Sequence, residues 1–236
     1  TLTNDASSGS ASTILINLET HPTHPQYRFV LRFLLGTPSN KDLQDELMKE
    51  ARFHNDIIQL NFEDIELHLT YKMVYGTFRW FVEVCPHASF IISTDDDVIL
   101  SLRNIQQHLR PRSPGADLYG GGTTFGFHPN RQPHTHSYVP ETQFPGSVYP
   151  PFNGGLFILM SRSTVQRLYS HAQCHVLINA DDIFVAVLAN ELKIIPTALP
   201  VKGVVSKERR KLALETHVAF LDGEMLHPRW SGPRER

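Results

Sequence analysis

The stretch FIISTDDDVIL, residues 90–100, decides how this chain is organised. It opens on an apolar run of the kind that forms a buried strand and closes on a second short apolar run. Between the two runs stand three consecutive acids, Asp95, Asp96 and Asp97. Adjacent carboxylates repel one another, so a fold holds them together at low cost only where a cation or hydrogen-bond donors offset the repulsion. Oxygen ligands at the end of a strand suit Mg²⁺ or Mn²⁺ carrying phosphates, and the alternative is a solvated acidic turn.

Composition bounds the class of protein. The chain has 236 residues, enough for one large α/β domain or two small ones. Hydrophobic residues make up 41% and charged residues 19%, so the chain can bury a sizeable core. A net charge of -2 argues against a nucleic-acid binder that works through bulk positive charge. Two cysteines, Cys85 and Cys174, allow one disulfide at most, which excludes a disulfide scaffold.

Neither a membrane span nor a metal-binding histidine motif is evident in the sequence. No apolar run reaches the length of a membrane-spanning helix, and we expect any anchor or signal to lie upstream of Thr1. The thirteen histidines are scattered along the chain. His134 and His136 stand close together, but in a Pro-rich stretch without zinc-type spacing, so we expect them to be loop residues.

Predicted strands alternate with predicted helices along the chain. Residues 1–25 are expected to form a flexible lead-in with a short first strand at 13–18, and residues 26–236 a single domain. The further strands are expected at 27–35, 56–60, 90–93, 117–120, 154–161, 194–196 and 218–221, and the helices at 42–53, 67–85, 101–109, 164–169 and 183–192. The remaining long stretches, 123–150 and 202–211, are expected to be loops. This alternation predicts an α/β domain with a mostly parallel central sheet flanked by helices, in which ligands bind beyond the carboxyl ends of the strands.

A second acidic pair, Asp181 and Asp182, precedes the apolar run at 183–192. A general base requires a carboxylate separate from those that hold a metal, and either acid could serve. The alternative is structural, because acids in the first turn of a helix also stabilise its positive end. The sequence contains no Walker-type phosphate loop and no Gly-x-Ser-x-Gly elbow, and neither cysteine has an evident catalytic partner.

Taken in order, the motifs resemble those of the β-1,3-galactosyltransferase and N-acetylglucosaminyltransferase family, which includes the fringe-like enzymes. The similar segments are FLLG at 33–36, DIIQ at 56–59, FED at 62–64, LTYK at 69–72, Trp80, Cys85-Pro86, DDDV at 95–98, YPPF at 149–152 with Gly155 and Ser161, and DDIFV at 181–185. The resemblance extends from about Tyr27 to Pro196. Several motifs in the same order are far more specific than the acidic triplet alone.

This resemblance implies a GT-A-type nucleotide-sugar-binding fold, a UDP-sugar donor and a divalent ion, Mn²⁺ or Mg²⁺. It implies inverting transfer of a hexose or N-acetylhexosamine to a hydroxyl of a glycan on a glycoprotein or glycolipid, with formation of a β-1,3 linkage. It also implies a type II membrane protein of the Golgi lumen, anchored by a segment upstream of this chain. A nucleic-acid partner is not expected.

The family's functional residues carry over onto matching positions of this sequence. In the resemblance, Asp95 and Asp97 of the Asp-x-Asp (DxD) motif would hold the metal, and Asp95, Asp96 and Lys72 would contact the donor. Asp182 matches the residue that would take the proton from the acceptor hydroxyl. The acceptor side would be formed by Phe152, Gly154, Gly155 and Asp181.

Some positions differ from the family pattern and favour an alternative function. An Arg-rich segment after the first strand is absent, and Ser93 replaces a lysine before the triplet. Asn153 and Phe157 replace a cysteine and a glycine, and we expect both to lie at the acceptor wall. These differences favour a catalytically inactive, glycosyltransferase-like sugar-binding module. A metal-dependent phosphohydrolase is a weaker alternative, since the usual accompanying His or Lys pattern is missing.

Overall fold

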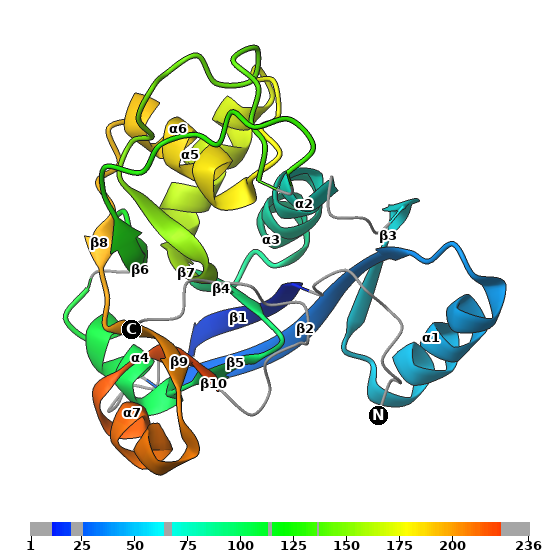
Figure 1. Ribbon diagram of the computed structural model, residues 1–236. Coiled ribbons are helices and arrows are strands. Elements are labelled where there is room, and N and C mark those ends of the chain that lie inside the picture. Colours follow the sequence, from blue (N-terminus) through cyan, green and yellow to red (C-terminus); the bar gives the residue numbers. More distant parts are fainter. Residues whose placement is uncertain (1–10, 20–25, 64–67, 113–114, 136, 223–236) are drawn as a thin grey trace.

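Two sheets organise the computed structural model, which describes residues 11–19, 26–63, 68–112, 115–135 and 137–222 (Figure 1). The large sheet has seven strands in the order β3 (Ile57–Glu63), β2 (Gln26–Thr37), β1 (Ala11–Glu19), β4 (Phe90–Asp95), β7 (Phe152–Ser161), β6 (Tyr119–Thr124) and β8 (Thr197–Ala198). The small sheet has three strands in the order β5 (Val98–Leu100), β10 (Ala219–Asp222) and β9 (Val201–Val205). The α/β class predicted from the sequence is therefore confirmed.

The large sheet is mixed, so the prediction of a mostly parallel sheet is wrong. Only β2–β3 and β6–β8 are parallel among the neighbouring pairs of the described sheet, whereas β1–β2, β1–β4, β4–β7 and β6–β7 are antiparallel. Only residues 20–25 separate β1 from β2. A parallel connection needs a crossover of a dozen or more residues, so β2 returns antiparallel beside β1.

Helices cover both faces of the large sheet. On one face, a continuous helical segment packs with α5 (Arg162–Ala172) and α6 (Asp181–Glu191), and together they enclose the main apolar core. That segment consists of α2 (Leu69–Tyr71), the π-helix η2 (Lys72–Phe78) and α3 (Arg79–Val84). On the other face, α4 (Leu102–Leu109) and β10 enclose a second core. The remaining helices are α1 (Lys41–His54), η3 (Lys207–Arg209) and α7 (Arg210–Thr216).

Most of the predicted elements are present, with boundaries that differ by a few residues. Two local predictions are wrong. The strand expected at 194–196 is absent and β8 begins after it, at Thr197, because Pro196 has no N–H to donate to a ladder. The loop expected at 202–211 instead contains part of β9, then η3 and the start of α7. The many charged residues of this stretch favoured a loop in the sequence analysis. The valine-rich strand β9 forms there by pairing with β10.

The π-helix η2 lies very close to the large sheet. A Cβ added at Gly76 would lie 2.5 Å from Leu60 Cδ1 and 2.8 Å from Leu34 Cδ2, so any larger residue here would have to displace these two leucine side chains. Leu34 belongs to β2 and is fully buried. The π-helix therefore packs closely against side chains of β2 and β3.

Arg162, at the start of α5, closes the end of α3. Its Nε donates to the carbonyl oxygen of Ala88 at 2.7 Å, and its Nη2 donates to the carbonyl oxygens of Phe81, at 3.2 Å, and Cys85. The guanidinium also lies 4.4 Å from the centre of the Phe81 ring. Helix ends leave carbonyls without partners inside the helix, and here one side chain from α5 satisfies them.

We expect Arg162→Met to lower the free energy of unfolding by about 3 kcal/mol, because several partly buried carbonyls lose a charged donor. The melting temperature should fall by roughly 6–12 °C. Arg79→Met is the matched control, since Arg79 only pairs with Glu83 on the surface of α3, where both side chains are about half exposed. Thermal unfolding of both variants checks this, and equal effects would contradict the role assigned to Arg162.

Candidate active site

The acidic triplet lies where the two sheets meet. Asp95 is the last residue of β4, Asp96 and Asp97 form a turn, and β5 begins at Val98. Residues 90–94 are buried, whereas Asp95 and Asp96 are exposed and Asp97 is half-buried. The strand is two residues longer than predicted, and the triplet stands at its carboxyl end as expected.

Asp182 lies in the first turn of α6, as predicted, and is held in place by two backbone donors. Its Oδ1 accepts from the N–H of Ile183 at 2.7 Å, and its Oδ2 accepts from the N–H of Gly155 in β7 at 3.3 Å. The helix itself is anchored by an almost continuous buried run from Ile183 to Ala186. The carboxylate is therefore oriented by the sheet as well as by its own helix.

The two acidic clusters lie close enough to affect each other's titration. Loss of hydration, then repulsion from Asp181, raises the pKa of Asp182 to about 7. The same two causes raise the pKa of Asp95 to about 7, with smaller contributions from Asp97 and Asp96. Because Asp95 still reaches water at the rim of the site, solvent screens part of its repulsion. The fold has thus gathered carboxylates whose charges oppose one another.

Lys72 is a buried residue whose positive charge acts on Asp181. It is the first residue of η2 and only 2% exposed. Burial raises the pKa of Asp181, and the charge of Lys72 acts in the opposite direction. The hydroxyl of Thr70 donates to the carbonyl oxygen of Ile178, which fixes α2 against the segment that leads into α6. The contact of Lys72 with a donor remains a prediction.

Open space borders Gly154 and Gly155 in β7, and the N–H of Gly155 donates to Asp182. A Cβ added at Gly154 or Gly155 would meet no described atom within 4 Å. Phe152, just before them, is mostly buried and packs edge-to-face on Phe127 with ring centroids 5.9 Å apart. Phe127 lies in the long loop and is 56% exposed, so an aromatic ring that the sequence analysis did not identify stands near this space.

Asn153 and Phe157 do not form an acceptor wall, and that expectation is wrong. Both are fully buried. The Asn153 side chain donates to the carbonyl oxygen of Tyr119 at 3.0 Å and accepts from Thr123 at 2.7 Å, so its polar atoms are satisfied inside the sheet. Phe157 packs in the second core. A Cβ at Gly121 would lie 2.8 Å from Asn153 Cβ, so the glycine-rich strand β6 makes the room that Asn153 fills.

The donor set fits a hard divalent ion. Carboxylates of Asp95 and Asp97 are the oxygen ligands that Mn²⁺ and Mg²⁺ prefer, and a cation would relieve the repulsion that raises the pKa of Asp95. The two carboxylates come from the end of β4 and from the turn that follows it.

Other candidate residues lie away from this site. His134 is a loop residue, as expected, and His136 lies outside the described residues. Cys85 and Cys174 both hold free thiols.

His171 and His175 meet Glu191 at the far end of α6, a cluster that the sequence analysis missed because α5 was expected to end at residue 169. Within the described residues, no helix has the length and apolar character needed to cross a membrane.

Comparison with known proteins identifies relatives of the chain. A sequence model of the galactosyltransferase family matches residues 17–200. The chain is 34% identical over 171 residues to a human acetylgalactosaminyl-O-glycosyl-glycoprotein β-1,3-N-acetylglucosaminyltransferase, with 70% of this chain and 44% of that protein covered. It is 30% identical over 162 residues to β-1,3-galactosyltransferase 5 of Gorilla gorilla gorilla, covering 69% and 54%. It is 29% identical over 201 residues to human N-acetyllactosaminide β-1,3-N-acetylglucosaminyltransferase 4, covering 78% and 53%.

The mixed α/β fold and these relatives define the class of the chain as a glycosyltransferase domain. Within that class, the chain belongs to the galactosyltransferase family, and its curated relatives are β-1,3-galactosyl- and N-acetylglucosaminyltransferases. The resemblance predicted from the motif order is confirmed. The chain spans about half the length of the curated relatives that it matches.

Proposed function

We propose that this protein is an inverting, metal-dependent glycosyltransferase that moves a hexose or N-acetylhexosamine from a UDP-sugar to a glycan hydroxyl and forms a β-1,3 linkage. The observation that carries the proposal is the position of Asp182, anchored by Gly155 and Ile183 and within electrostatic reach of Asp95. A carboxylate that is fixed, partly desolvated and beside open space is suited to act as a general base.

Asp182 would take the proton of the acceptor hydroxyl as that oxygen attacks C1 of the donor sugar. The bond from C1 to the UDP oxygen breaks on the opposite side, UDP leaves with the bonding electrons, and the anomeric configuration inverts. A pKa of about 7 makes Asp182 a better proton acceptor than an ordinary carboxylate at neutral pH. Its two backbone donors keep one orientation and so reduce the entropy cost of the step.

Asp95 and Asp97 would hold Mn²⁺ or Mg²⁺, and this ion would supply the positive charge that the donor diphosphate requires. Asp96, with Asp95, would contact the donor ribose. Lys72 would contribute its positive charge to binding of the donor. The same charge already acts on Asp181. These carboxylates repel one another without a cation, which supports a site completed by metal and donor.

The acceptor would occupy the open side of β7. Gly154 and Gly155 border open space, and the N–H of Gly155 contacts Asp182, which follows Asp181. Phe152 with Phe127 offers an aromatic border against which a sugar ring can pack. The acceptor would be a glycan on a glycoprotein or glycolipid. The Golgi lumen is the proposed location, with attachment to the membrane through a segment outside this chain.

Incubation of the protein with Mn²⁺ and a panel of UDP-sugars, with and without glycan acceptors, tests the proposal. The relatives are named for transfer of N-acetylglucosamine or galactose, so UDP-N-acetylglucosamine and UDP-galactose are the first donors to compare. We expect one of them to release UDP in an acceptor-dependent manner. Donor binding without any UDP release would favour the inactive sugar-binding module, and neither binding nor release would overturn both functions.

We expect the metal-free protein to lose stability as the pH rises from 5 to 8. The pKa values of Asp95 and Asp182, about 7 in the fold, lie above those of the unfolded chain, about 4. The fold therefore favours their protonated forms, and the stability that this provides below pH 4 is lost as the pH rises through 7. Solvent screens part of the Asp95 contribution, so Asp182 supplies most of the loss, which is about 3 kcal/mol, or roughly 6–12 °C in melting temperature.

Thermal unfolding in the presence of a chelator checks this pH dependence. Asp182→Asn removes one of the titrating groups and should flatten the profile. A melting temperature that stays constant or rises between pH 5 and 8, equally in both proteins, would contradict the clustering of charges.

A further inference from the structure

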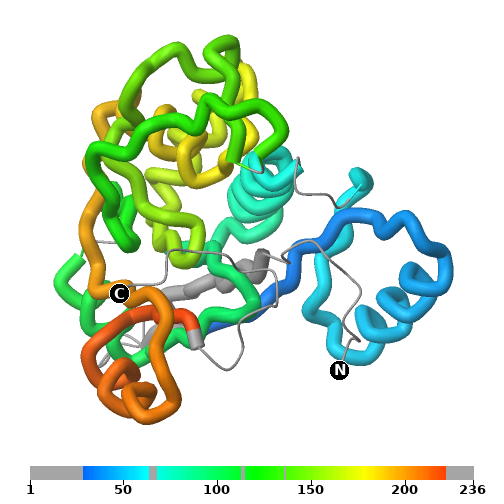
Figure 2. Tube along the Cα trace, viewed as in Figure 1, coloured from blue at the N-terminus to red at the C-terminus, as the bar shows by residue number. Residues whose placement is uncertain are grey.

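A second cluster of metal-ligating side chains lies at the far end of α5 and α6. His171 stands in the last turn of α5, His175 in the bend after it, and Glu191 is the last residue of α6. Glu191 Oε2 lies 2.7 Å from His171 Nε2 and 2.8 Å from His175 Nε2, and all three ligand atoms lie within 4.8 Å of one another. Figure 2 follows the chain through these two helices, which pack against each other.

Hydrogen bonding defines the protonation of His175. Its Nδ1 lies 2.9 Å from the carbonyl oxygen of His171, which can only accept, so Nδ1 carries a proton. In a neutral His175 the lone pair of Nε2 then points at the carboxylate oxygen of Glu191. Two acceptors 2.8 Å apart are stable only if His175 becomes an imidazolium or if a cation binds between them. An Nδ1–H donated to a carbonyl is also the usual support of a histidine that binds metal through Nε2.

Glu191 can pair with an imidazolium or bind a cation, because it keeps its negative charge. Partial burial acts to raise its pKa, but hydrogen bonds from His171 and the charge of His175 outweigh this and hold the pKa of Glu191 below its usual range.

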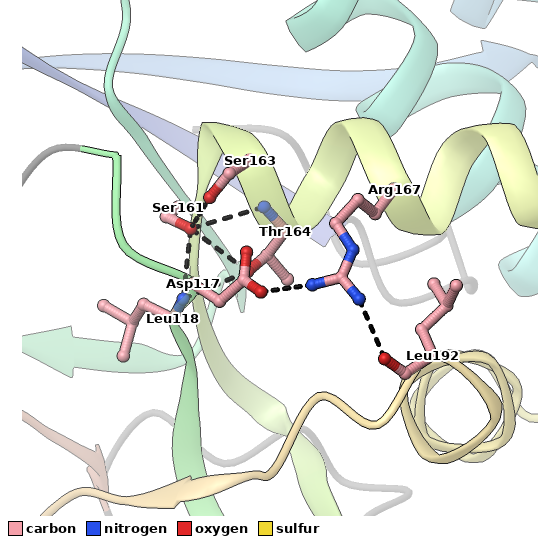
Figure 3. A network of polar contacts seen from close by, with 7 residues as sticks. All are labelled: Asp117, Leu118, Ser161, Ser163, Thr164, Arg167 and Leu192. Atoms are coloured by element: carbon pink, nitrogen blue, oxygen red, sulfur yellow. Dashed lines mark hydrogen bonds and ion pairs between the residues drawn. The ribbon is translucent and has the colours of Figure 1, made fainter.

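The helices are fixed beside each other independently of this cluster. Arg167, one turn before His171, donates to the carbonyl oxygen of Leu192 at 2.8 Å and pairs with Asp117 (Figure 3). Figure 3 shows the guanidinium reaching from α5 to the residue that follows α6. At the start of α5, the Ser161 side chain accepts a hydrogen bond from the N–H of Thr164 and so caps the helix. The backbones that carry the three ligands are thus held in place before any ion arrives.

A hollow opens beside His171. Its volume is about 480 Å³, and it is lined by Gln166, Arg167, Ser170, His171 and Leu192. Of the three side chains in the cluster, His171 lines the hollow, which has room for a water molecule or another small ligand beside this residue.

We propose that His171 Nε2, His175 Nε2 and the Glu191 carboxylate bind one Zn²⁺ ion, or a similar transition metal, with water from the adjacent hollow as fourth ligand. Two imidazoles and one carboxylate favour Zn²⁺ over Mg²⁺ and Mn²⁺. Zinc–nitrogen distances of about 2.0–2.1 Å place tetrahedral ligand atoms about 3.3 Å apart. The Glu191 oxygen must therefore move about 0.5 Å away from each imidazole. The three side chains are 25–42% exposed and have the freedom to do so.

The proposed ion would join α5 to the end of α6 opposite Asp182. Its primary effect would be on stability, because it links two segments that separate in the unfolded chain. The site shares no residue with the acidic cluster around Asp95, so it stands or falls independently of the proposed transfer reaction.

The test uses protein in which Asp95→Asn and Asp97→Asn remove the ligands of the first site. We expect calorimetric titration with Zn²⁺ at neutral pH to give one bound ion, with a rise in melting temperature. His175→Ala, His171→Gln and Glu191→Gln should each weaken binding by about a hundredfold and abolish the rise. His87→Ala, an exposed histidine elsewhere, is the matched control and should change neither.

Co²⁺ provides a direct readout of ligand geometry. The parent protein should develop the intense visible absorption of four-coordinate Co²⁺, and Glu191→Gln, which keeps the size of the side chain, should not. If Zn²⁺ does not bind even in excess, the cluster is only an imidazolium–carboxylate ion pair and the proposal is wrong. Equal Zn²⁺ affinity in the parent protein and in His175→Ala would overturn it as well.

Discussion

Asp182→Asn is expected to lower the rate of glycosyl transfer by about 10³-fold while the affinity for the UDP-sugar changes little. The asparagine keeps the size of the side chain and can still accept a hydrogen bond, but it cannot take a proton from the acceptor. Because Asp182 is proposed to act only on the acceptor hydroxyl, donor binding at the triplet should remain. Transfer assays and donor-binding isotherms on the same protein measure the two effects separately.

A structural role for Asp182 makes a different prediction. An acid in the first turn of a helix stabilises the helix end, and its loss would lower stability and donor binding together. Asp42→Asn is the matched control, since Asp42 occupies the first turn of α1, a helix that lies well away from β4 and β5 in Figure 1. If Asp182→Asn behaves like Asp42→Asn in activity, Asp182 is not the base.

Asp97→Asn is expected to abolish metal-dependent donor binding, with a loss of affinity of at least about a hundredfold. It removes one of the two carboxylates proposed to hold the ion. The same change should make the metal-free protein slightly more stable, because the charge of Asp97 contributes to the repulsion on Asp95. Opposite effects on stability and on binding distinguish a ligand site from a structural ion pair.

Titration of the UDP-sugar with and without Mn²⁺, alongside thermal unfolding in a chelator, measures both effects. Donor affinity that remains intact in Asp97→Asn would show that the metal assignment is wrong. Ser93→Ala is a suitable neighbouring control, since Ser93 is buried in β4 and is proposed to contact neither ion nor donor.

Local pattern sufficed to predict the parts of the site that depend on one element at a time. The triplet follows a buried strand, and Asp182 lies in the first turn of a helix, because both positions are set by neighbouring apolar residues. The short connection between β1 and β2 already indicates an antiparallel pair, but the order of the strands, which sets the other directions, depends on tertiary pairing. The burial of Phe157 depends on packing against residues distant in sequence. Strand β9 was not predicted for the same reason, because its partner β10 comes later in the chain, after η3 and α7.

The histidine cluster shows a further limit of sequence reasoning. His171 and His175 are four residues apart, a spacing that becomes meaningful only when α5 extends to Ala172. Glu191 comes from another helix, and the contact depends on the packing of α5 against α6. No spacing rule along the chain links residues that meet through tertiary structure.

The position of β1 has a consequence for shortened forms of this protein. Although it comes first among the described strands, β1 pairs with β2 on one side and with β4 on the other. A form that starts after residue 19 would leave two facing strand edges with unsatisfied backbone groups in the middle of the sheet. Such edges recruit strands from other molecules, so truncation here should produce aggregation rather than a smaller soluble domain. Expression boundaries for this domain should therefore include the whole of Ala11–Glu19.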